Sequence, residues 1–158
     1  MFLTEKHLSA YNSKKIEAEY TLKGVYVLII RVDEDTDVNV GAIGRLTFKK
    51  GLYAYVGSAQ NNLEQRVKRH LRKEKRRFWH VDYFLDNDAA KVVEVFQQQV
   101  DKAEECAIAG VIGERGESMD GFGSSDCSCK SHLFRIGDYG FLQEFMQVLG
   151  VKTVKSTF

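Results

Sequence analysis

Apolar residues along the chain fall into short runs with strand or helix periodicity. The run Gly24–Val32 is apolar almost throughout, which is typical of a strand buried on both faces of a sheet. Residues 44–48 and 52–56 also have strand composition, and residues 49–51 between them end in glycine. We therefore predict that these two segments pair as a hairpin. Further strands are expected at 91–97 and 131–136.

Helical periodicity predicts a helix over residues 62–73, with Leu63, Val67 and Leu71 as its inner stripe and an asparagine at position 61 or 62 as its cap. A shorter helix is expected at 80–85.

A further helix is predicted over residues 101–112, with Asp101 as N-cap in a capping box with Glu104. Apolar residues recur at helical spacing on one of its faces, which is expected to be buried. That face carries Ala103, Cys106, Ala107, Gly110 and Val111.

The order of elements predicts an α+β fold, a small mixed and mainly antiparallel sheet flanked by helices, because hairpins precede the helices. A chain of 158 residues is about one domain. We expect a polar extension at 1–20 and the domain itself at 21–137. A C-terminal amphipathic helix within 138–158, carrying apolar residues at 142–149 and ending at Gly150, should pack on the same domain.

The composition is that of a globular protein, with 44% hydrophobic and 28% charged residues and a formal net charge of +1. No apolar stretch approaches the roughly 20 residues of a membrane helix, so no membrane partner is expected. Residues 1–20 are charged and do not resemble a secretory signal. An odd number of cysteines, three, indicates a reducing, cytoplasmic setting.

Positive charge is concentrated in residues 66–77, which we expect to form a basic helix that contacts phosphates. The alternative is a solvated helix face. Phe78 and Trp79 follow directly and either stack on a base or anchor the helix end. The candidate nucleic-acid contacts are Lys68, Arg69, Arg72, Lys73, Arg76 and Arg77.

Three further residues stand out by their position on a helix face. Arg66 and His70 are separated by four residues, so they share a face that borders the sheet, where an arginine can hold a phosphate. Glu105 shares a face with Ile108 and Ile112, and a carboxylate in such surroundings needs a partner. That partner is either a metal ion or a basic side chain.

The tripeptides Gly24-Val-Tyr26 and Tyr55-Val-Gly57, followed by Arg66 and His70, resemble the GIY-YIG nuclease superfamily, with valine in place of isoleucine in both. More of the chain, roughly residues 22–136, resembles one archaeal and bacterial branch of unknown function, found alone or attached to endonuclease III-type repair enzymes. The stretches that carry this second likeness are 57–59, 66–72, 79–83, 105–109 and 121–134.

The resemblance implies a GIY-YIG-like fold and a divalent-metal-dependent DNA endonuclease, a hydrolase of phosphodiester bonds in DNA repair or branched-DNA processing. Tyr26, Tyr55, Arg66 and His70 would be its catalytic residues, and Glu105 would bind one Mg²⁺ or Mn²⁺ ion. A tyrosine beside a metal and arginines would ionise enough to act as base. The sequence does not decide which tyrosine does so. The implied partners are a nucleic acid, DNA or alternatively RNA, and a base-excision repair glycosylase.

Two departures from the superfamily pattern keep other functions open. The gap between the two triplets is wider than usual, and the asparagine that many members carry after the glutamate has no counterpart here. A non-catalytic nucleic-acid-binding module that uses the basic helix 66–77 is therefore the alternative. A zinc-stabilised interaction domain is the third hypothesis.

The glycine- and serine-rich loop 118–130 offers two kinds of chemistry. Cys127, Cys129 and His132 lie close in sequence, and Cys106 on the predicted helix is a candidate fourth ligand. The Cys-x-Cys spacing is not that of a zinc knuckle, so Zn²⁺ is not favoured there. Packed cysteines are the alternative. Backbone N–H groups near Gly123, Ser124 and Ser125 are candidates for a phosphate-binding loop.

Overall fold

The computed structural model describes residues 23–148. Its strands are β1 (Gly24–Val32), β2 (Thr36–Val40), β3 (Gly44–Phe48), β4 (Gly51–Ala59), β5 (Ala90–Gln98), β6 (Gly116–Ser118), β7 (Leu133–Ile136) and β8 (Gln147–Val148). Its helices are α2 (Leu63–Leu71), α3 (His80–Leu85) and α4 (Glu104–Gly113), with 3-10 turns at Gly41–Ile43 and Gly140–Glu144.

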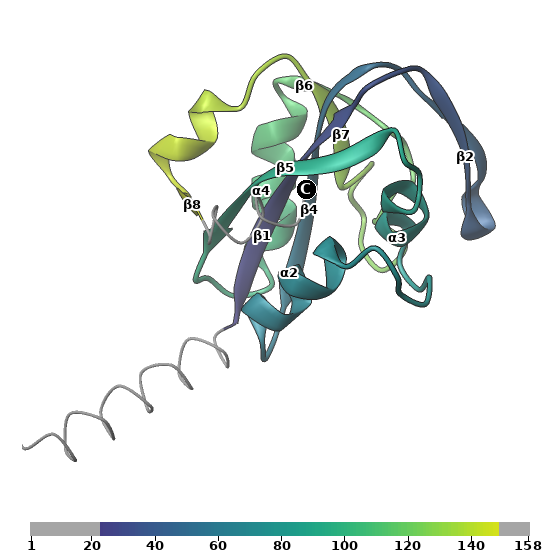
Figure 1. Ribbon diagram of the computed structural model, residues 1–158. Coiled ribbons are helices and arrows are strands. Elements are labelled where there is room, and N and C mark those ends of the chain that lie inside the picture. The colour runs from purple at the N-terminus through teal and green to yellow at the C-terminus, as the bar shows by residue number, and fades with distance from the viewer. Residues whose placement is uncertain (1–22, 149–158) are drawn as a thin grey trace, which may run out of the picture.

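Six of the strands form one sheet in the order β6-β7-β4-β1-β5-β8, and every pairing in it is antiparallel. The strand β1 lies inside this sheet between β4 and β5, while α4 and the pair α2 and α3 lie beside it (Figure 1). The predicted α+β fold, with a mainly antiparallel sheet flanked by helices, is confirmed.

Both faces of the sheet are covered, which explains the unbroken apolar run of β1. Along β1 the residues alternate between two core clusters: Leu28 and Ile30 belong to one, and Val27 and Ile29 to the other. The first cluster also contains the inner residues of α2 and α3, and the second contains those of α4. The sheet is therefore the middle layer of three.

The predicted hairpin of residues 44–48 with 52–56 is wrong. The strand β3 pairs with β2 in a separate two-stranded sheet, whereas β4 pairs with β1 and β7. The turn between β2 and β3 uses Gly41 and Gly44, whose φ angles of 47° and 93° favour glycine. These glycines let the chain reverse one segment earlier than the Lys49-Lys50-Gly51 signal suggests.

Two predicted helices begin or end elsewhere. Helix α2 ends at Leu71, where the ammonium of Lys75 donates to the Arg72 and His70 carbonyls. Residues 72–77 therefore form an irregular segment rather than the end of a basic helix. Helix α4 begins at Glu104 without a side-chain cap, because the Asp101 carboxylate is paired with Lys23 instead.

The predicted buried face of α4 is also wrong. Ile108, Ala109 and Ile112 are buried, whereas Val111 on the expected face is 42% exposed. The larger β-branched side chains bury more apolar surface than the alanines and glycine of the expected face, and this decides which face packs on the sheet.

The amphipathic helix expected within 138–158 is not formed over the described residues. Residues Gly140–Glu144 make a 3-10 turn that buries Leu142, and β8 then pairs with β5. The edge of β5 offers unpaired backbone groups, and the chain satisfies them with a strand. The rest of this prediction, and the polar extension at 1–20, lie outside the described residues.

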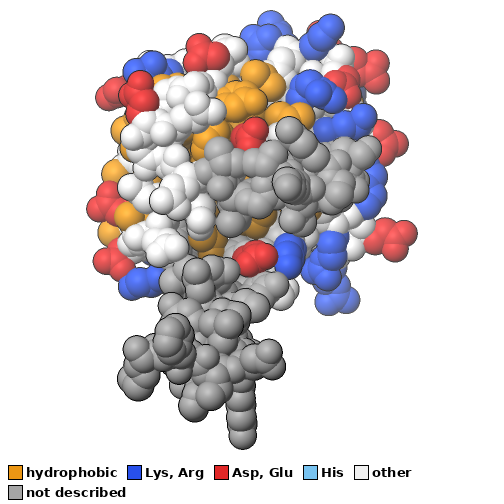
Figure 2. Space-filling model, turned by 60° about the vertical axis from the view of Figure 1, so that its left-hand side comes forward, with side chains coloured by type: hydrophobic (Ala, Val, Ile, Leu, Met, Phe, Trp, Pro, Cys, Tyr) orange, Lys and Arg blue, Asp and Glu red, His pale blue; other side chains and the backbone are white. Residues whose placement is uncertain are grey.

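Charges of both signs share the surface. On the face shown in Figure 2, basic side chains gather toward one edge with acidic side chains beside them. This mixture agrees with the net charge of +1. Among residues 23–148, no helix has the length and apolar character needed to cross a membrane.

Candidate active site

Strands β1 and β4 bring the two sequence triplets face to face. Tyr26 on β1 is paired with Gly57 on β4, and the rings of Tyr26 and Tyr55 lie 6.5 Å apart. A Cβ at position 57 would stand 2.5 Å from the Tyr26 hydroxyl oxygen. Glycine is therefore required at this position, because the Tyr26 phenol occupies the space of a side chain.

The Tyr26 hydroxyl is hydrogen-bonded to a histidine of α2. Its oxygen lies 2.7 Å from Nε2 of His70, whose residue is 2% exposed. Burial, helped by the charges of Arg69, Lys75 and Arg66, lowers the pKa of His70 to about 3, against the opposing effect of Asp82. The imidazole is therefore neutral at physiological pH, with Nε2 within hydrogen-bond distance of the Tyr26 hydroxyl.

The pKa values of Tyr26 and Tyr55, the tyrosines of the two triplets, are both raised, so both side chains are harder to ionise. Burial raises the pKa of Tyr26, and the Arg66 guanidinium opposes this only in part. Burial raises the pKa of Tyr55 as well, and the neighbouring Tyr26 adds to the effect. Desolvation therefore outweighs the charge of Arg66 at both tyrosines, and the ionisation expected beside a metal ion and arginines stays a prediction.

Arg66 lies on the first turns of α2 and reaches back to the end of β4. Its Nη1 donates to the Ser58 carbonyl at 3.1 Å, and its guanidinium carbon stands 4.4 Å from the centre of the Trp79 ring. A guanidinium held by an aromatic face and a carbonyl is fixed in direction. Trp79 therefore anchors this arginine, and does not offer an open face for stacking.

Glu105, on the first turn of α4, points back toward the strands. The Ser58 hydroxyl donates to its Oε2 at 2.6 Å, and Nδ1 of His132 lies 3.0 Å from its Oε1. Its side chain is 15% exposed. A carboxylate has about four lone-pair positions, so each oxygen retains one that these partners leave open.

A single cavity of about 360 Å³ joins these groups. The predicted Tyr26, Tyr55, Arg66 and Glu105 all line it, from β1, β4, α2 and α4 respectively. His70 is not in its wall, because it stands behind Tyr26. The remaining lining residues are Gly57, Ser58, Phe78, Trp79, His80, Lys102, Gly123, Ser125 and Asp126.

Arg69 has a structural partner, the buried carboxylate of Asp82. Its guanidinium donates to both carboxylate oxygens of Asp82, each at 3.0 Å, and the Asp82 side chain is fully buried. The backbone N–H groups of Phe78 and Trp79 donate to the same carboxylate. Asp82 therefore ties α2 to α3 beneath the cavity, and the role of Arg69 as a nucleic-acid contact stays a prediction.

Some of the other basic residues predicted to contact nucleic acid form ion pairs within the protein, and others are exposed. Lys73 is paired with Asp88 and Arg77 with Asp86, both on the surface, and Lys68 is paired with Glu64 along α2. Exposed pairs of this kind are weak and exchange readily for another anion. Arg72 and Arg76 are exposed in the irregular segment. Arg72 also lines a polar hollow of about 500 Å³ that shares Ser58, Arg66 and Lys102 with the cavity.

The predicted phosphate-binding loop is largely used within the protein. The Gly123 N–H donates to Nδ1 of His80 at 2.8 Å, so it is not free for a phosphate. Ser124 is buried and does not line the cavity, whereas Ser125 does. The φ of 70° at Gly123 serves close packing against His132 and Tyr55.

Sequence reasoning missed four residues around Glu105. Ser58 and His132 hold its two oxygens, and Lys102 and Asp126, paired at 3.7 Å, border the cavity opposite. Ser58 follows directly after the second triplet, which is a usable signal. The other three depend on loop geometry that no short-range pattern encodes.

The donor set suits a hard divalent cation. Glu105 presents carboxylate oxygens to the cavity, and hydroxyls of Ser58 and the two tyrosines lie around it. Mg²⁺ prefers oxygen ligands and keeps several waters, so one carboxylate is sufficient protein anchoring. The residues therefore fit a Mg²⁺ or Mn²⁺ ion.

Comparison with known proteins finds a match to one family model. The model described as a domain of unknown function, DUF123, matches residues 25–153, which include every residue of the site. No curated protein and no solved structure matches the chain.

Proposed function

The chain belongs to the DUF123 family of domains of unknown function, and within it we propose that this member is a divalent-metal-dependent endonuclease that cleaves phosphodiester bonds in DNA. The observation that carries the proposal is the joining of Tyr26, Tyr55, Arg66 and Glu105 in one cavity. These residues come from four separate elements. The same gathering supports a relationship to the GIY-YIG nucleases, because the residues of both triplets and the helix arginine share it.

The base in this mechanism is Tyr26 acting together with His70. As a water molecule attacks phosphorus, its proton passes to the Tyr26 oxygen while the Tyr26 proton passes to Nε2 of His70, 2.7 Å away. The imidazolium that forms has its Nδ1 3.8 Å from the Asp82 carboxylate, which stabilises the new charge. Tyr26 is assigned ahead of Tyr55 because it has this proton acceptor.

The remaining residues bind and polarise the phosphate. Arg66, fixed by Trp79 and Ser58, presents its guanidinium to the phosphate oxygens. A divalent cation on Glu105 would offset the negative charge that develops on the phosphate and the leaving oxygen. Ser58 orients the carboxylate for this task by donating to its other oxygen. Tyr55 forms a wall of the cavity beside Tyr26.

A nucleic-acid substrate is supported by the surroundings of the cavity. The polar hollow lined by Arg72 shares Arg66 and Lys102 with the cavity. Phosphates on either side of the bond that is cleaved would therefore have cationic partners. Phe78, at the cavity rim, is 74% exposed. An exposed aromatic ring beside a phosphate track is suited to stack on a base that is not paired, as in frayed or branched DNA.

The test is a cleavage panel with plasmid and synthetic branched DNA, with Mg²⁺ or Mn²⁺ supplied. Glu105→Gln should lower the cleavage rate at least a hundredfold, because the cation loses its anionic ligand. Glu104→Gln is the matched control, since this neighbour is exposed on the same turn, and it should cut like the unaltered protein. Cutting that survives in Glu105→Gln would remove the metal assignment.

One observation favours a second function, the non-catalytic binding of DNA or RNA. Both oxygens of Glu105 already have partners within the protein, Ser58 and His132. If these contacts persist in the presence of Mg²⁺, the same surface would bind nucleic acid without cutting it. Salt-sensitive binding of DNA or RNA with no cleavage under any metal would establish this function in place of the first.

The cytoplasmic location and the protein partner are proposed from fewer observations than the activity. All three cysteines are free thiols, in keeping with a reducing, cytoplasmic compartment. A base-excision repair glycosylase is the protein partner suggested by the resemblance alone. Co-purification of such an enzyme with the full chain, sensitive to substitutions outside the cavity, would test it.

A further inference from the structure

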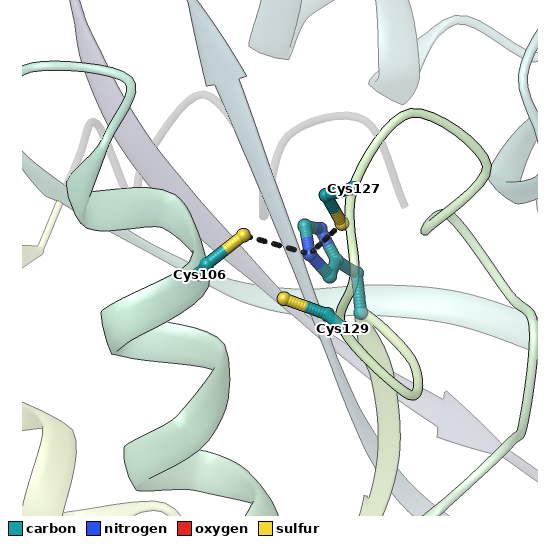
Figure 3. Close-up of side chains that lie close together, drawn as sticks. Cys106, Cys127 and Cys129 are labelled. Atoms are coloured by element: carbon teal, nitrogen blue, oxygen red, sulfur yellow. Dashed lines mark hydrogen bonds between the residues drawn. The ribbon is translucent and has the colours of Figure 1, made fainter.

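Four potential metal ligands from distant parts of the chain meet behind Glu105. They are Cys106 on α4 and Cys127, Cys129 and His132 in the segment between β6 and β7, and their ligand atoms all lie within 4.8 Å of one another. Figure 3 shows the side chains of Cys106, Cys127 and Cys129 pointing toward one another, Cys106 from α4 and the other two from the loop. We propose that these residues form a zinc site, and that its histidine ligand orients Glu105 in the neighbouring cavity.

The distances already approach those of a tetrahedral site. Nε2 of His132 lies 3.4 Å from the Cys127 sulfur and 3.9 Å from the Cys106 sulfur. A tetrahedron with Zn–S of about 2.3 Å and Zn–N of about 2.0 Å separates nitrogen from sulfur by about 3.5 Å and sulfur from sulfur by about 3.8 Å. A zinc ion therefore needs only small side-chain adjustments, and the backbone can remain in place.

The histidine is oriented for metal binding. Its Nδ1 lies 3.0 Å from the Glu105 carboxylate, an ion-pair distance, while its Nε2 lies among the sulfurs. A zinc ion bound at Nε2 would place the ring proton on Nδ1, on the side of this carboxylate. A carboxylate behind the distal nitrogen of a ligating histidine is the usual support of zinc-binding histidines.

Neither apolar packing nor a disulfide bond gives a role to all four groups of the cluster. Ordinary apolar packing would bury the cysteines, but all three are only half-buried. A disulfide would use two sulfurs and leave the third and the imidazole without a function. Zinc uses all four groups, and three sulfur ligands with one nitrogen favour it over harder ions.

A zinc ion would also account for the loop that contains its ligands. Residues 119–132 have no helix or strand, yet Phe122 and His132 within them are almost fully buried. A complete set of four protein ligands is typical of structural zinc. Binding converts three thiols to thiolates, releases their protons to water, and joins the loop to the start of α4.

The proposed zinc site affects the cavity because two of its ligands lie next to Glu105. Cys106 is the neighbour of Glu105, and His132 contacts Glu105 directly. The ion would therefore fix the carboxylate from two sides. The zinc site itself does not depend on the proposed cleavage, whereas its effect on Glu105 in catalysis rests on that function.

The experiment uses the full chain, purified without chelator from zinc-supplemented cells. Elemental analysis should find one zinc per chain, and exchange with Co²⁺ should give the visible absorption of tetrahedral cobalt with thiolate ligands. Each of Cys106→Ser, Cys127→Ser and Cys129→Ser should lower the metal content and abolish the cobalt spectrum. Ser128→Ala, an exposed position between two ligands, should keep both.

A second measurement on the unaltered protein covers the case in which these variants fail to fold. A thiol reagent should react slowly with the three cysteines of the zinc-loaded chain and rapidly after chelation. Absence of bound zinc, with no cobalt spectrum and equal thiol reactivity with and without chelator, would overturn the inference. Zinc binding without DNA cleavage would reject only the proposed function, and cleavage without zinc would reject only this site.

Discussion

The Tyr26 hydroxyl is hydrogen-bonded to Nε2 of a histidine that is itself buried and neutral, His70. The pair joins β1 to α2, and Asp82 stands behind it at 3.8 Å. Buried hydroxyls usually donate to carbonyl groups, which cannot take up a proton. Here the partner is an imidazole, a group that can be protonated, and the proton transfer proposed for Tyr26 depends on it.

Replacing Tyr26 with phenylalanine removes the hydroxyl and keeps the ring. We expect the cleavage rate to fall about 10² to 10⁴-fold, as for loss of a general base. Tyr53→Phe is the matched control, because this hydroxyl donates to the Lys49 carbonyl away from the cavity. The control should cost about 1 kcal/mol of unfolding free energy and leave the rate unchanged. Equal rates for the two variants would exclude Tyr26 as the base.

The stability of the fold should fall in mild acid because of His70. Its pKa is about 3 in the folded protein and near 6.5 when exposed, so between these values the unfolded chain binds the extra proton. The unfolding free energy is therefore unaffected by protonation of His70 above pH 6.5, and it decreases as the pH falls from 6.5 toward 3. From about pH 7 to about pH 4.5 the loss should be about 2 to 3 kcal/mol.

Urea unfolding at several pH values measures this loss, and His70→Gln should flatten the profile. Proton NMR of the His70 ring gives a direct check that does not require the variant to fold. An imidazole that titrates near its ordinary value in the folded protein would contradict the assignment of a neutral, buried histidine.

Arg69 and Arg72 should separate stability from binding. Arg69→Ala leaves the buried Asp82 carboxylate without its ion-pair partner, so we expect a loss of about 3 to 5 kcal/mol in unfolding free energy. Arg72→Ala alters an exposed side chain and should leave stability unchanged. It should weaken DNA binding and lower the slope of log affinity against log salt by about 1.

Thermal unfolding and a salt titration of DNA binding distinguish the two effects. A large stability loss in Arg72→Ala, or none in Arg69→Ala, would show that the roles inferred from the ion pair are mistaken.

Two glycines should respond in opposite directions to the same added methyl group. Gly57→Ala forces the Tyr26 ring to move, because the new Cβ would stand 2.5 Å from it, and should cost about 1 to 3 kcal/mol. Gly110→Ala, with nothing within 4 Å and a position inside α4, should stabilise by about 0.5 to 1 kcal/mol. Denaturation curves of both variants check the pair.

The sequence predicted the parts of the fold that depend on local pattern. The limits of β1 and α3 and the Asn62 cap of α2 follow from apolar runs and capping residues. The pairing of β3 was mispredicted, because the turn at Gly41 and Gly44 competes with the Lys49-Lys50-Gly51 signal and only tertiary packing chooses between them.

The site divides in the same way. Tyr26, Tyr55, Arg66 and Glu105 were found because a resemblance assigns them roles, and the structure brings them to one cavity. The tyrosine pKa values and the pairing of Arg69 with Asp82 could not be predicted, since both depend on burial. Cys106 was named as a possible fourth ligand beside Cys127, Cys129 and His132, but its approach to the loop could not be established from the sequence, because it lies on another element and meets the loop only after folding.

The first turn of α4 carries Glu105 and Cys106 side by side, one facing the cavity and the other facing the sulfur cluster. Consecutive residues of an α-helix are rotated by about 100° about its axis. The carboxylate and the thiol therefore project from different sides of the same turn. Inserting a single residue ahead of Glu105 would turn both groups away from their neighbours at once. This turn should therefore tolerate substitution of its exposed residues far better than any change in its length.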